Sequence, residues 1–236
     1  MADPWSEIMI DAAKGVSGEY TIERDDGRIE TLEVLDYIRT LLNWSECERL
    51  AIQHAHGRVL DIGCGAGRVS LYLQNLGHKV VGIDLALGAI EACKMRGVRE
   101  AYLMSAAEID FPDAIFDTII MYGNNFGVLG SDQSIIDMLR TLYRITTPQG
   151  MILAGSADVV KTDIQEHLDY HKLNLSRNRP KGLVRMRVAY KGLVDKWIDL
   201  RLATPEEMEN LAEKAGWRLE RKYQDGVPYV GILVKK

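Results

Sequence analysis

The stretch that decides the fold is Val59-Leu60-Asp61-Ile62-Gly63-Cys64-Gly65-Ala66-Gly67-Arg68. Its apolar first half predicts a short buried strand, and its glycines stand where that strand turns into a helix. Glycine lets a backbone approach a ligand closely and adopt a positive φ angle. The helix that follows begins with unpaired N–H groups, which favour a polar ligand. Because such a run can also be a plain tight turn, a second feature is needed.

That second feature is an acidic residue at the end of the next predicted strand. Asp84 ends the stretch 79–84, about 20 residues after Gly63. A carboxylate at this place reaches the two ribose hydroxyls of an adenosine-type ligand. Acids at strand ends are common without a ligand, but together with the glycine run Asp84 predicts an adenosine site.

The residues around the glycines indicate which adenosine ligand fits. The dinucleotide fingerprint ends in a small residue, and Arg68 stands at that position. Asp61 places a negative charge beside the loop, which is unfavourable for a pyrophosphate and favourable for an ammonium group. An adenosine that carries an amino acid therefore fits better than a dinucleotide.

The run Asp61–Gly67 resembles motif I of the class I S-adenosylmethionine-dependent methyltransferases, and Asp84 matches their motif II acid. The stretches 22–28 and 122–127 also resemble a subgroup of bacterial and archaeal members without a known substrate. The resemblance implies an α/β, doubly wound, Rossmann-like fold with a mostly parallel seven-stranded sheet whose last strand is antiparallel. It implies S-adenosylmethionine as cofactor and S-adenosylhomocysteine as product.

The resemblance also implies roles for single residues. The loop glycines line the methionine part, Asp61 orients its amino group, Asp84 holds the ribose and Leu85 packs against adenine. The family often has an acid after the third strand, where this chain has small residues from Ser105 to Ala107. The implied cofactor contacts are Asp61, Gly63, Cys64, Gly65, Gly67, Asp84, Leu85, Ser105, Ala106, Ala107, Tyr122 and Gly123.

The chain is predicted to have two parts, an N-terminal helical cap over residues 1–55 and a methyltransferase domain over 56–236. Periodicity and turn signals predict a helix over 1–18, an extended piece at 20–28 and helical structure over 31–54. The domain is predicted to alternate strands and helices, which gives a parallel sheet covered on both faces. The predicted strands are 58–62, 79–84, 100–104, 116–122, 150–155, 217–223 and 229–235, and the predicted helices are 66–76, 86–96, 131–146 and 204–216.

Residues 157–200 interrupt this alternation and are interpreted as an insertion on the substrate side. Residues 158–175 are expected to be helical, and 183–190 with 196–202 to form an antiparallel hairpin. We expect the cap and the insertion to form a lid together, with Tyr20, Arg24 and Arg28 of the cap as candidates to close over the cofactor.

Four residues are candidates for catalysis. Asn125 follows the fourth predicted strand and belongs either to a wall for the methyl acceptor or to a polar turn. His167 and His171 share one helix face, and Tyr170 lies near them. One of these residues acts as a general base, or the histidines are ordinary surface residues. A third alternative is that the two histidines bind a metal ion, although no third ligand is evident nearby. Methyl transfer from a sulfonium needs a base only if the acceptor must lose a proton. The Asn/Asp-Pro-Pro-aromatic motif is absent from the sequence, which disfavours adenine in DNA and glutamine side chains as acceptors.

The charge and the cysteine content limit the kinds of partner and the compartment that the sequence predicts. With 29 basic and 34 acidic residues the net charge is −5, which disfavours a broad nucleic-acid-binding face, although 177–187 is a local basic run. Three cysteines without CxxC spacing predict a reducing, cytoplasmic compartment, and we expect neither a secretory signal nor a membrane span. The function predicted is methyl transfer to a small-molecule acceptor. The alternatives are an RNA or protein methyltransferase, a non-catalytic cofactor-binding protein and an NAD-type oxidoreductase. No motif specifies the methylated atom or the oligomeric state.

Overall fold

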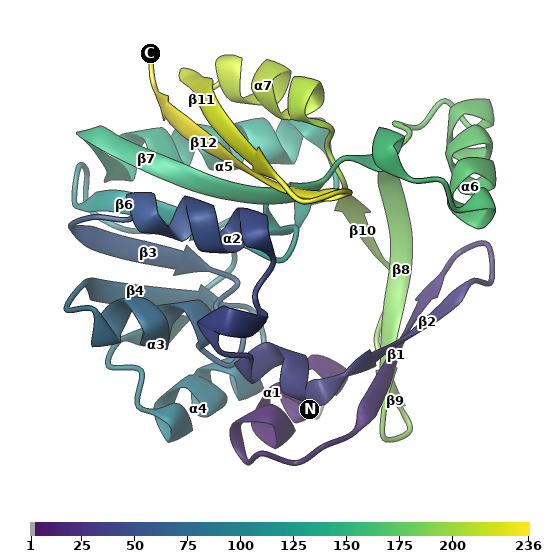
Figure 1. The fold of residues 1–236 in the computed structure, drawn as a ribbon, viewed down its shortest axis with the longest axis horizontal. Coiled ribbons are helices and arrows are strands. Elements are labelled where there is room, and N and C mark those ends of the chain that lie inside the picture. Colours follow the sequence, from purple (N-terminus) through teal and green to yellow (C-terminus); the bar gives the residue numbers. More distant parts are fainter. Residues whose placement is uncertain (1–2) are drawn as a thin grey trace.

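The computed structural model describes residues 3–236 and places seven of their strands in one central sheet (Figure 1). These strands are β3 (Arg58–Ile62), β4 (Lys79–Asp84), β5 (Ala101–Leu103), β6 (Phe116–Met121), β7 (Thr146–Ala157), β11 (Trp217–Gln224) and β12 (Pro228–Lys235). Their order is β11-β12-β7-β6-β3-β4-β5, and β12 is antiparallel to both β7 and β11. The predicted doubly wound, mostly parallel seven-stranded sheet is confirmed.

Helices cover both faces of this sheet. The α-helices of the described residues are α1 (Pro4–Ala13), α2 (Glu46–Ala51), α3 (Arg68–Asn75), α4 (Leu87–Arg96), α5 (Asp132–Ile145), α6 (Gln165–Ser176) and α7 (Pro205–Glu213), of which α2, α3, α5 and α7 pack in the cores on this sheet. Alternate residues of a strand point to opposite faces. Accordingly Leu60 packs in a core with α5 and α7, whereas Val59 packs in a core with α2 and α3. The apolar strand at 58–62 is therefore buried from both sides.

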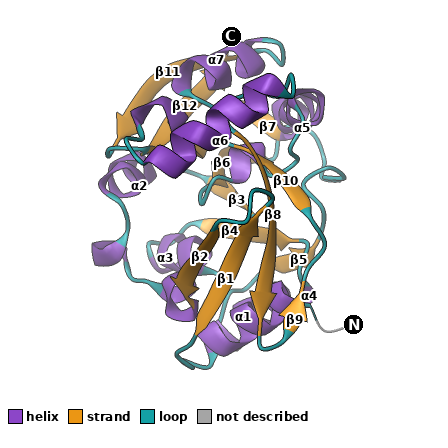
Figure 2. Cartoon of the chain, turned by 90° about the vertical axis from the view of Figure 1, so that its right-hand side faces the viewer, coloured by secondary structure: helices purple, strands orange, loops and turns teal. Residues whose placement is uncertain are grey.

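A second, antiparallel sheet joins two parts of the chain that are far apart in sequence. Its strands are β1 (Glu19–Arg24), β2 (Ile29–Glu33), β8 (Leu183–Tyr190), β9 (Leu193–Val194) and β10 (Ile198–Arg201). They run in the order β10-β8-β1-β2, and β9 pairs with β8. Figure 2 shows this sheet facing the viewer with α6 above it. The sequence predicted the hairpin of the insertion, but not its pairing with the N-terminal hairpin through Thr21 and Ala189.

The cap is helical only in part, which corrects the expectation for residues 1–55. α1 ends at Ala13 rather than near Gly18, and residues 1–2 lie outside the described part. The expected helix over 31–54 is instead the end of β2, the short 3-10 helices 34–38, 41–43 and 52–54, and α2. The reason is that its apolar side chains serve different cores: Leu32 packs near α1, Leu41 packs near α2, and Leu42 is 82% exposed.

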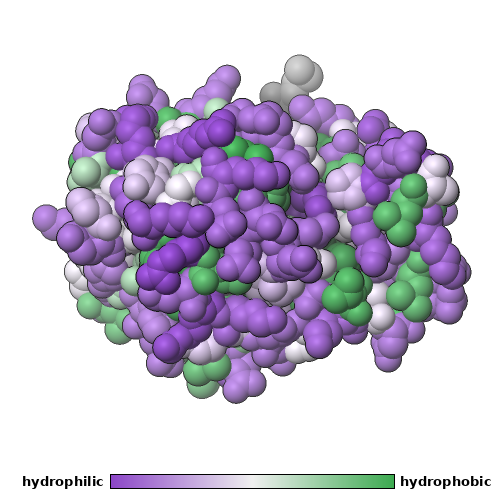
Figure 3. Space-filling model, turned by 90° about the horizontal axis from the view of Figure 1, so that it is seen from above, coloured by the Kyte–Doolittle hydropathy of each residue, from purple (hydrophilic) through white to green (hydrophobic). Residues whose placement is uncertain are grey.

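The predicted helix at 204–216 is confirmed, and its start has the expected chemistry. Thr204 and Glu207 form a capping box, and Pro205 occupies the first helical position of α7. The helix predicted over 158–175 is shorter and begins at Gln165. Among residues 3–236, none of the helices has the length and apolar character needed to cross a membrane. The face seen in Figure 3 is mainly hydrophilic, with small scattered apolar patches.

The fold predicts a specific weak point where α1 docks on α4. Gly88 N donates a 2.9 Å hydrogen bond to Ser6 Oγ, and a Cβ at Gly88 would overlap the backbone of Ser6. Gly88→Ala should lower the free energy of unfolding by about 1–3 kcal/mol, measured by urea denaturation, because the helices must move apart. Glu91→Ala, on the exposed side of α4, should stay within about 0.5 kcal/mol of the parent protein. Equal stability of the two variants would contradict this packing.

Candidate functional site

A cavity of about 830 Å³ lies beyond the carboxyl ends of β3, β4 and β6 and is closed by residues of the second sheet. This edge is where ligands bind in open α/β sheets, and the volume is that of a small-molecule site. The cavity is lined by the glycine loop, by the cap and by the insertion. Lining residues from the cap and the insertion include Trp5, Met9, Tyr20, Leu32, Tyr37, Trp44, Glu48, Asp195, Lys196 and Ile198.

The glycine loop has the backbone geometry for which glycine is needed. Gly63, Gly65 and Gly67 have φ angles of 70°, 53° and 76°. A side chain at Gly63 would overlap the Asn125 carboxamide, and a Cβ at Gly67 would lie 2.6 Å from Val98. A Cβ at Gly65 would lie 3.4 Å from Met9 Sδ, so α1 covers the loop closely. Gly63, Cys64 and Gly65 line the cavity, so their backbone is open to a ligand there, whereas Gly67 is not among the lining residues.

Asp84 ends β4 and lies at the cavity wall, as the sequence predicted. Its carboxylate accepts hydrogen bonds from Gly65 N at 3.0 Å and Ala86 N at 2.9 Å. Burial raises the pKa of Asp84, and these backbone N–H groups counteract that shift. A carboxylate has about four lone-pair positions. Asp84 can therefore hold the loop and still accept from the two hydroxyls of a ribose.

Asp61 is a buried carboxylate beside the loop, with 2% of its surface exposed. Ser70 Oγ donates a 2.6 Å hydrogen bond to Asp61 Oδ2, which leaves Oδ1 for a ligand. Burial raises the pKa of Asp61 to about 6, although the Ser70 hydrogen bond and Arg68 act in the opposite direction. A buried carboxylate of this kind gains most from a cationic partner, such as an ammonium group.

The part of the cavity wall where the resemblance implies an adenine contact is formed by Leu85, Ser105 and Ala106. Leu85 lines the cavity and is 73% exposed, so a flat apolar surface is open to a base. Ser105 and Ala106 also line it, whereas Ala107 is not among the lining residues. Ser105 Oγ accepts from Ala107 N at 3.1 Å. The Ser105 Oγ atom therefore already accepts one hydrogen bond within its own loop. A hydrogen bond from an adenine amino group would be a second one to the same oxygen.

Tyr122, Gly123 and Asn125 line the cavity after β6. Tyr122 Oη donates to the carbonyl of Glu48 at 3.1 Å, which ties the cap to the end of β6. Asn125 Nδ2 donates to the carbonyls of Ile62 at 2.9 Å and Gly63 at 3.3 Å. Asn125 thus lies against the glycine loop, a contact that the sequence did not predict, and its role in an acceptor wall or in catalysis stays a prediction.

The two histidines and Tyr170 lie apart from this cavity, and none of the three lines it. Tyr170 Oη donates a 2.6 Å hydrogen bond to Asp25, and Arg24 stacks over its ring at 4.1 Å. His167 lies 3.3 Å from Thr162 and 3.6 Å from Glu30. Burial lowers the pKa of His171.

These contacts tie α6 to the β1–β2 turn. The structure does not bring the histidines together with Asn125. A catalytic role for the histidines therefore stays a prediction. Among residues 3–236, no cluster of three or more His, Cys, Asp or Glu side chains is arranged to hold a metal ion.

The candidates for a closing cap and the basic run also have definite places. Tyr20 lines the cavity, but Arg24 and Arg28 contact Glu166 of α6 instead. The basic run is engaged in ion pairs with neighbouring acids. Its pairs are Arg177 and Arg179 with Asp25, Arg185 with Asp199, and Arg187 with Glu23.

A cluster that the sequence did not predict joins the cap to the start of α3, just after the glycine loop. Both Arg68 Nη atoms donate to the Glu48 carboxylate, at 3.1 and 2.8 Å, and the guanidinium lies 4.4 Å from the Trp44 ring. Ser45 caps α2 by accepting from Glu48 N. The Ser45-to-Glu48 spacing is a helix-start signal, and it would have placed Glu48 in the first turn of a helix.

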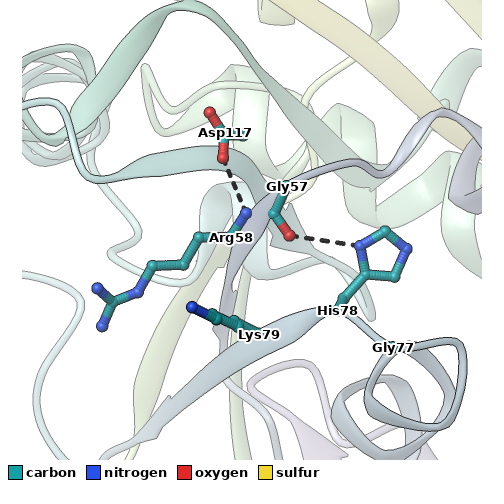
Figure 4. Close-up of a pocket in the computed structure, with 6 residues that line it drawn as sticks. All are labelled: Gly57, Arg58, Gly77, His78, Lys79 and Asp117. Atoms are coloured by element: carbon teal, nitrogen blue, oxygen red, sulfur yellow. Dashed lines mark hydrogen bonds between the residues drawn. The ribbon is translucent and has the colours of Figure 1, made fainter.

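A second pocket, of about 530 Å³, lies at the opposite edge of the sheet (Figure 4). Asp117 accepts from Arg58 N at 2.8 Å, and His78 faces the Gly57 carbonyl at 3.3 Å. These residues stand at the amino ends of β3, β4 and β6. Because ligands of open α/β sheets bind at the carboxyl ends, this pocket is not the candidate site.

The buried Asp61 makes a prediction about stability. Its pKa of about 6 in the folded protein lies above the ordinary value of 3.8, so the folded state binds the proton more tightly. The resulting cost to stability is absent well below pH 3.8 and grows until about pH 6, where it levels off. Asp61→Asn removes this cost, so its gain over the ligand-free parent should be about 2 kcal/mol larger at pH 8 than at pH 4.5, by urea denaturation. A gain that does not change with pH would contradict the shifted pKa.

Comparison with known proteins agrees with this geometry. Residues 59–150 match the family model described as methyltransferase domain. The chain is 36% identical over 106 residues to malonyl-[acyl-carrier protein] O-methyltransferase of Yersinia pestis, covering 44% of this chain and 38% of that protein. It is 26% identical over 165 residues to ubiquinone biosynthesis O-methyltransferase of Ruegeria sp. (strain TM1040), covering 67% of this chain and 59% of that protein. The chain thus spans less than two thirds of these relatives.

A solved structure matches nearly the whole fold. The S-adenosylmethionine-dependent methyltransferase from Bacteroides fragilis, in complex with S-adenosyl-L-homocysteine, superimposes with a TM-score of 0.84 at 23% identity. The match covers 99% of this chain and 94% of that one, so it includes the cap and the insertion. The sheet order, the glycine loop and the methyltransferase-domain match over residues 59–150 together make this chain similar to the class I S-adenosylmethionine-dependent methyltransferases.

Proposed function

We propose that the protein is a methyltransferase that uses S-adenosylmethionine to methylate a small-molecule acceptor. The observation that carries the proposal is that two carboxylates line one cavity beside the glycine loop, with Asp61 just before the loop and Asp84 accepting a hydrogen bond from Gly65 N within it. In this proposal Asp84 accepts hydrogen bonds from a ribose diol, and Asp61 pairs with an ammonium group. An amino-acid nucleoside is the ligand that satisfies both carboxylates.

The cofactor, when bound, supplies a methyl group on a sulfonium centre that is already activated. The protein then has to hold the donor, exclude water and align the acceptor. Aromatic rings from the cap suit the first two tasks, since Tyr37 and Trp44 line the cavity near the loop. Aromatic faces also attract cations. Tyr20 Oη donates to Tyr37 Oη at 3.2 Å, which fixes the Tyr37 ring against the loop.

Three observations support a small acceptor. A cavity of about 830 Å³ is in the range of single small-molecule sites, so the room beside a nucleoside is limited. Residues of the cap and of the insertion both line it, which narrows the space left for a large acceptor. The basic run at 177–187 is engaged with neighbouring acids, which weakens the case for RNA. The O-methyltransferase relatives named above are consistent with this choice.

The compartment follows from the cysteines. Cys47, Cys64 and Cys93 are buried free thiols, and the Cys64 and Cys93 sulfur atoms lie 3.7 Å apart without a disulfide. A reducing environment favours this state. A cytoplasmic location is therefore part of the proposal.

Calorimetry with S-adenosylhomocysteine and NAD tests the proposed cofactor. The parent protein should bind S-adenosylhomocysteine and not NAD. Asp84→Asn should weaken S-adenosylhomocysteine binding by about 10- to 100-fold, because an amide cannot accept both ribose hydroxyls as a carboxylate does. Asp113→Asn, which alters an exposed acid paired with Arg144, is the matched control and should bind like the parent. Tighter binding of NAD, or full affinity in Asp84→Asn, would overturn the proposal.

A further inference from the structure

The turn after β6 touches the cofactor loop on one side. Asn125 Nδ2 donates to the carbonyls of Ile62 and Gly63, at 2.9 and 3.3 Å. Since both partners are carbonyls, which only accept, the nitrogen of the amide must face the loop. A Cβ on Gly63 would overlap this amide, so the amide lies directly against the loop backbone.

The same turn touches the insertion on its other side. A Cβ on Gly127 would overlap the Arg201 carbonyl, and a Cβ on Gly130 would lie 2.7 Å from the Asp199 carbonyl. Both partners belong to β10. Glycine at these two positions therefore lets the turn and β10 pack backbone to backbone.

β10 in turn forms part of the cavity wall that faces the acceptor. Ile198 at its start lines the cavity, and Lys196 lines it two residues earlier. The turn 123–130 thus stands between the loop that would hold the cofactor and the strand that borders the acceptor. Gly123 and Asn124 have φ angles of 67° and 69°, so the turn leaves β6 in a fixed, left-handed backbone conformation.

We propose that Asn125 is a positioning residue that fixes the cofactor loop relative to β10. The inference rests on the proposed function, and it assigns to the Asn125 amide nitrogen a role in alignment rather than contact with the reacting atoms. Alignment errors of about 1 Å are enough to lower a transfer rate strongly, so a tether at this point matters for an in-line displacement. Without the tether, the loop and β10 become independently mobile.

Two substitutions separate the donor role from simple packing. Asn125→Asp keeps the size of the side chain but replaces the donor by an oxygen that repels the two carbonyls. Asn125→Gln keeps the carboxamide donor on a longer stem. If the donor matters, Gln should preserve more of the tether than Asp does, although Asp is closer in size. If only volume matters, the order should be reversed.

Hydrogen exchange with and without S-adenosylhomocysteine measures the tether directly and needs no acceptor. The free ligand concentration is set to 100 times the dissociation constant of each variant. An amide that exchanges only through an opening that releases the ligand should then exchange about 100-fold more slowly than it does without ligand. In the parent protein this protection should reach both the loop at 63–67 and β10 at 198–201. In Asn125→Asp the loop should keep its protection, while protection of β10 should fall below about 3-fold.

Asn124→Gly is the matched control, because glycine adopts the left-handed conformation of Asn124 freely. It should keep protection at both segments, and Asn125→Gln should keep more at β10 than Asn125→Asp does. Full protection of β10 in Asn125→Asp, or equal loss in Asn124→Gly, would overturn the role of Asn125. Failure of the parent protein to bind S-adenosylhomocysteine would instead overturn the proposed function.

Discussion

A carboxylate buried beside a glycine-rich turn is the constraint on which the candidate site depends. Asp61 sits on β3 with 2% of its surface exposed and one hydrogen-bond donor, Ser70. Burying a charge is costly unless a partner offsets it, and the raised pKa of about 6 reflects that cost. The cost is recovered only when a cation enters the cavity. In the proposed function, this cost to stability in the ligand-free state is offset when an ammonium group binds beside Asp61.

The site is completed by two segments that lie far apart in the sequence. The N-terminal hairpin and the insertion pair through β1 and β8 in one sheet, and this sheet closes the cavity over the loop. The ion pair between Glu48 and Arg68 connects α2 of the cap to α3, which packs on the central sheet. The turn at Asn125 connects the loop to β10. Donor and acceptor walls are therefore parts of one connected framework.

The sequence predicted the central sheet well, because its strands are short apolar runs between glycines and its motifs are local. Val59–Ile62 and Asp84 are examples in which neighbouring residues alone determine a strand and the place where it ends. It predicted the cap poorly, since Leu32, Ile38 and Leu41 have helical spacing but pack in different cores. The histidines of α6 were chosen from helix periodicity, which carries no information on which cavity the helix faces. Contacts such as Glu48 with Arg68 are decided by tertiary packing and leave no pattern in the sequence.

The proton count on ligand binding tests the central role of Asp61 most directly. At pH 6 about half of the ligand-free molecules carry a proton on Asp61, and an ammonium group beside the carboxylate should expel it. Calorimetric titration with S-adenosylhomocysteine in buffers of different ionisation enthalpy should therefore show release of about half a proton per ligand at pH 6 and almost none at pH 8. Asp61→Asn should abolish the release at pH 6. Binding without proton release at pH 6 in the parent protein, or an unchanged release in Asp61→Asn, would contradict the account.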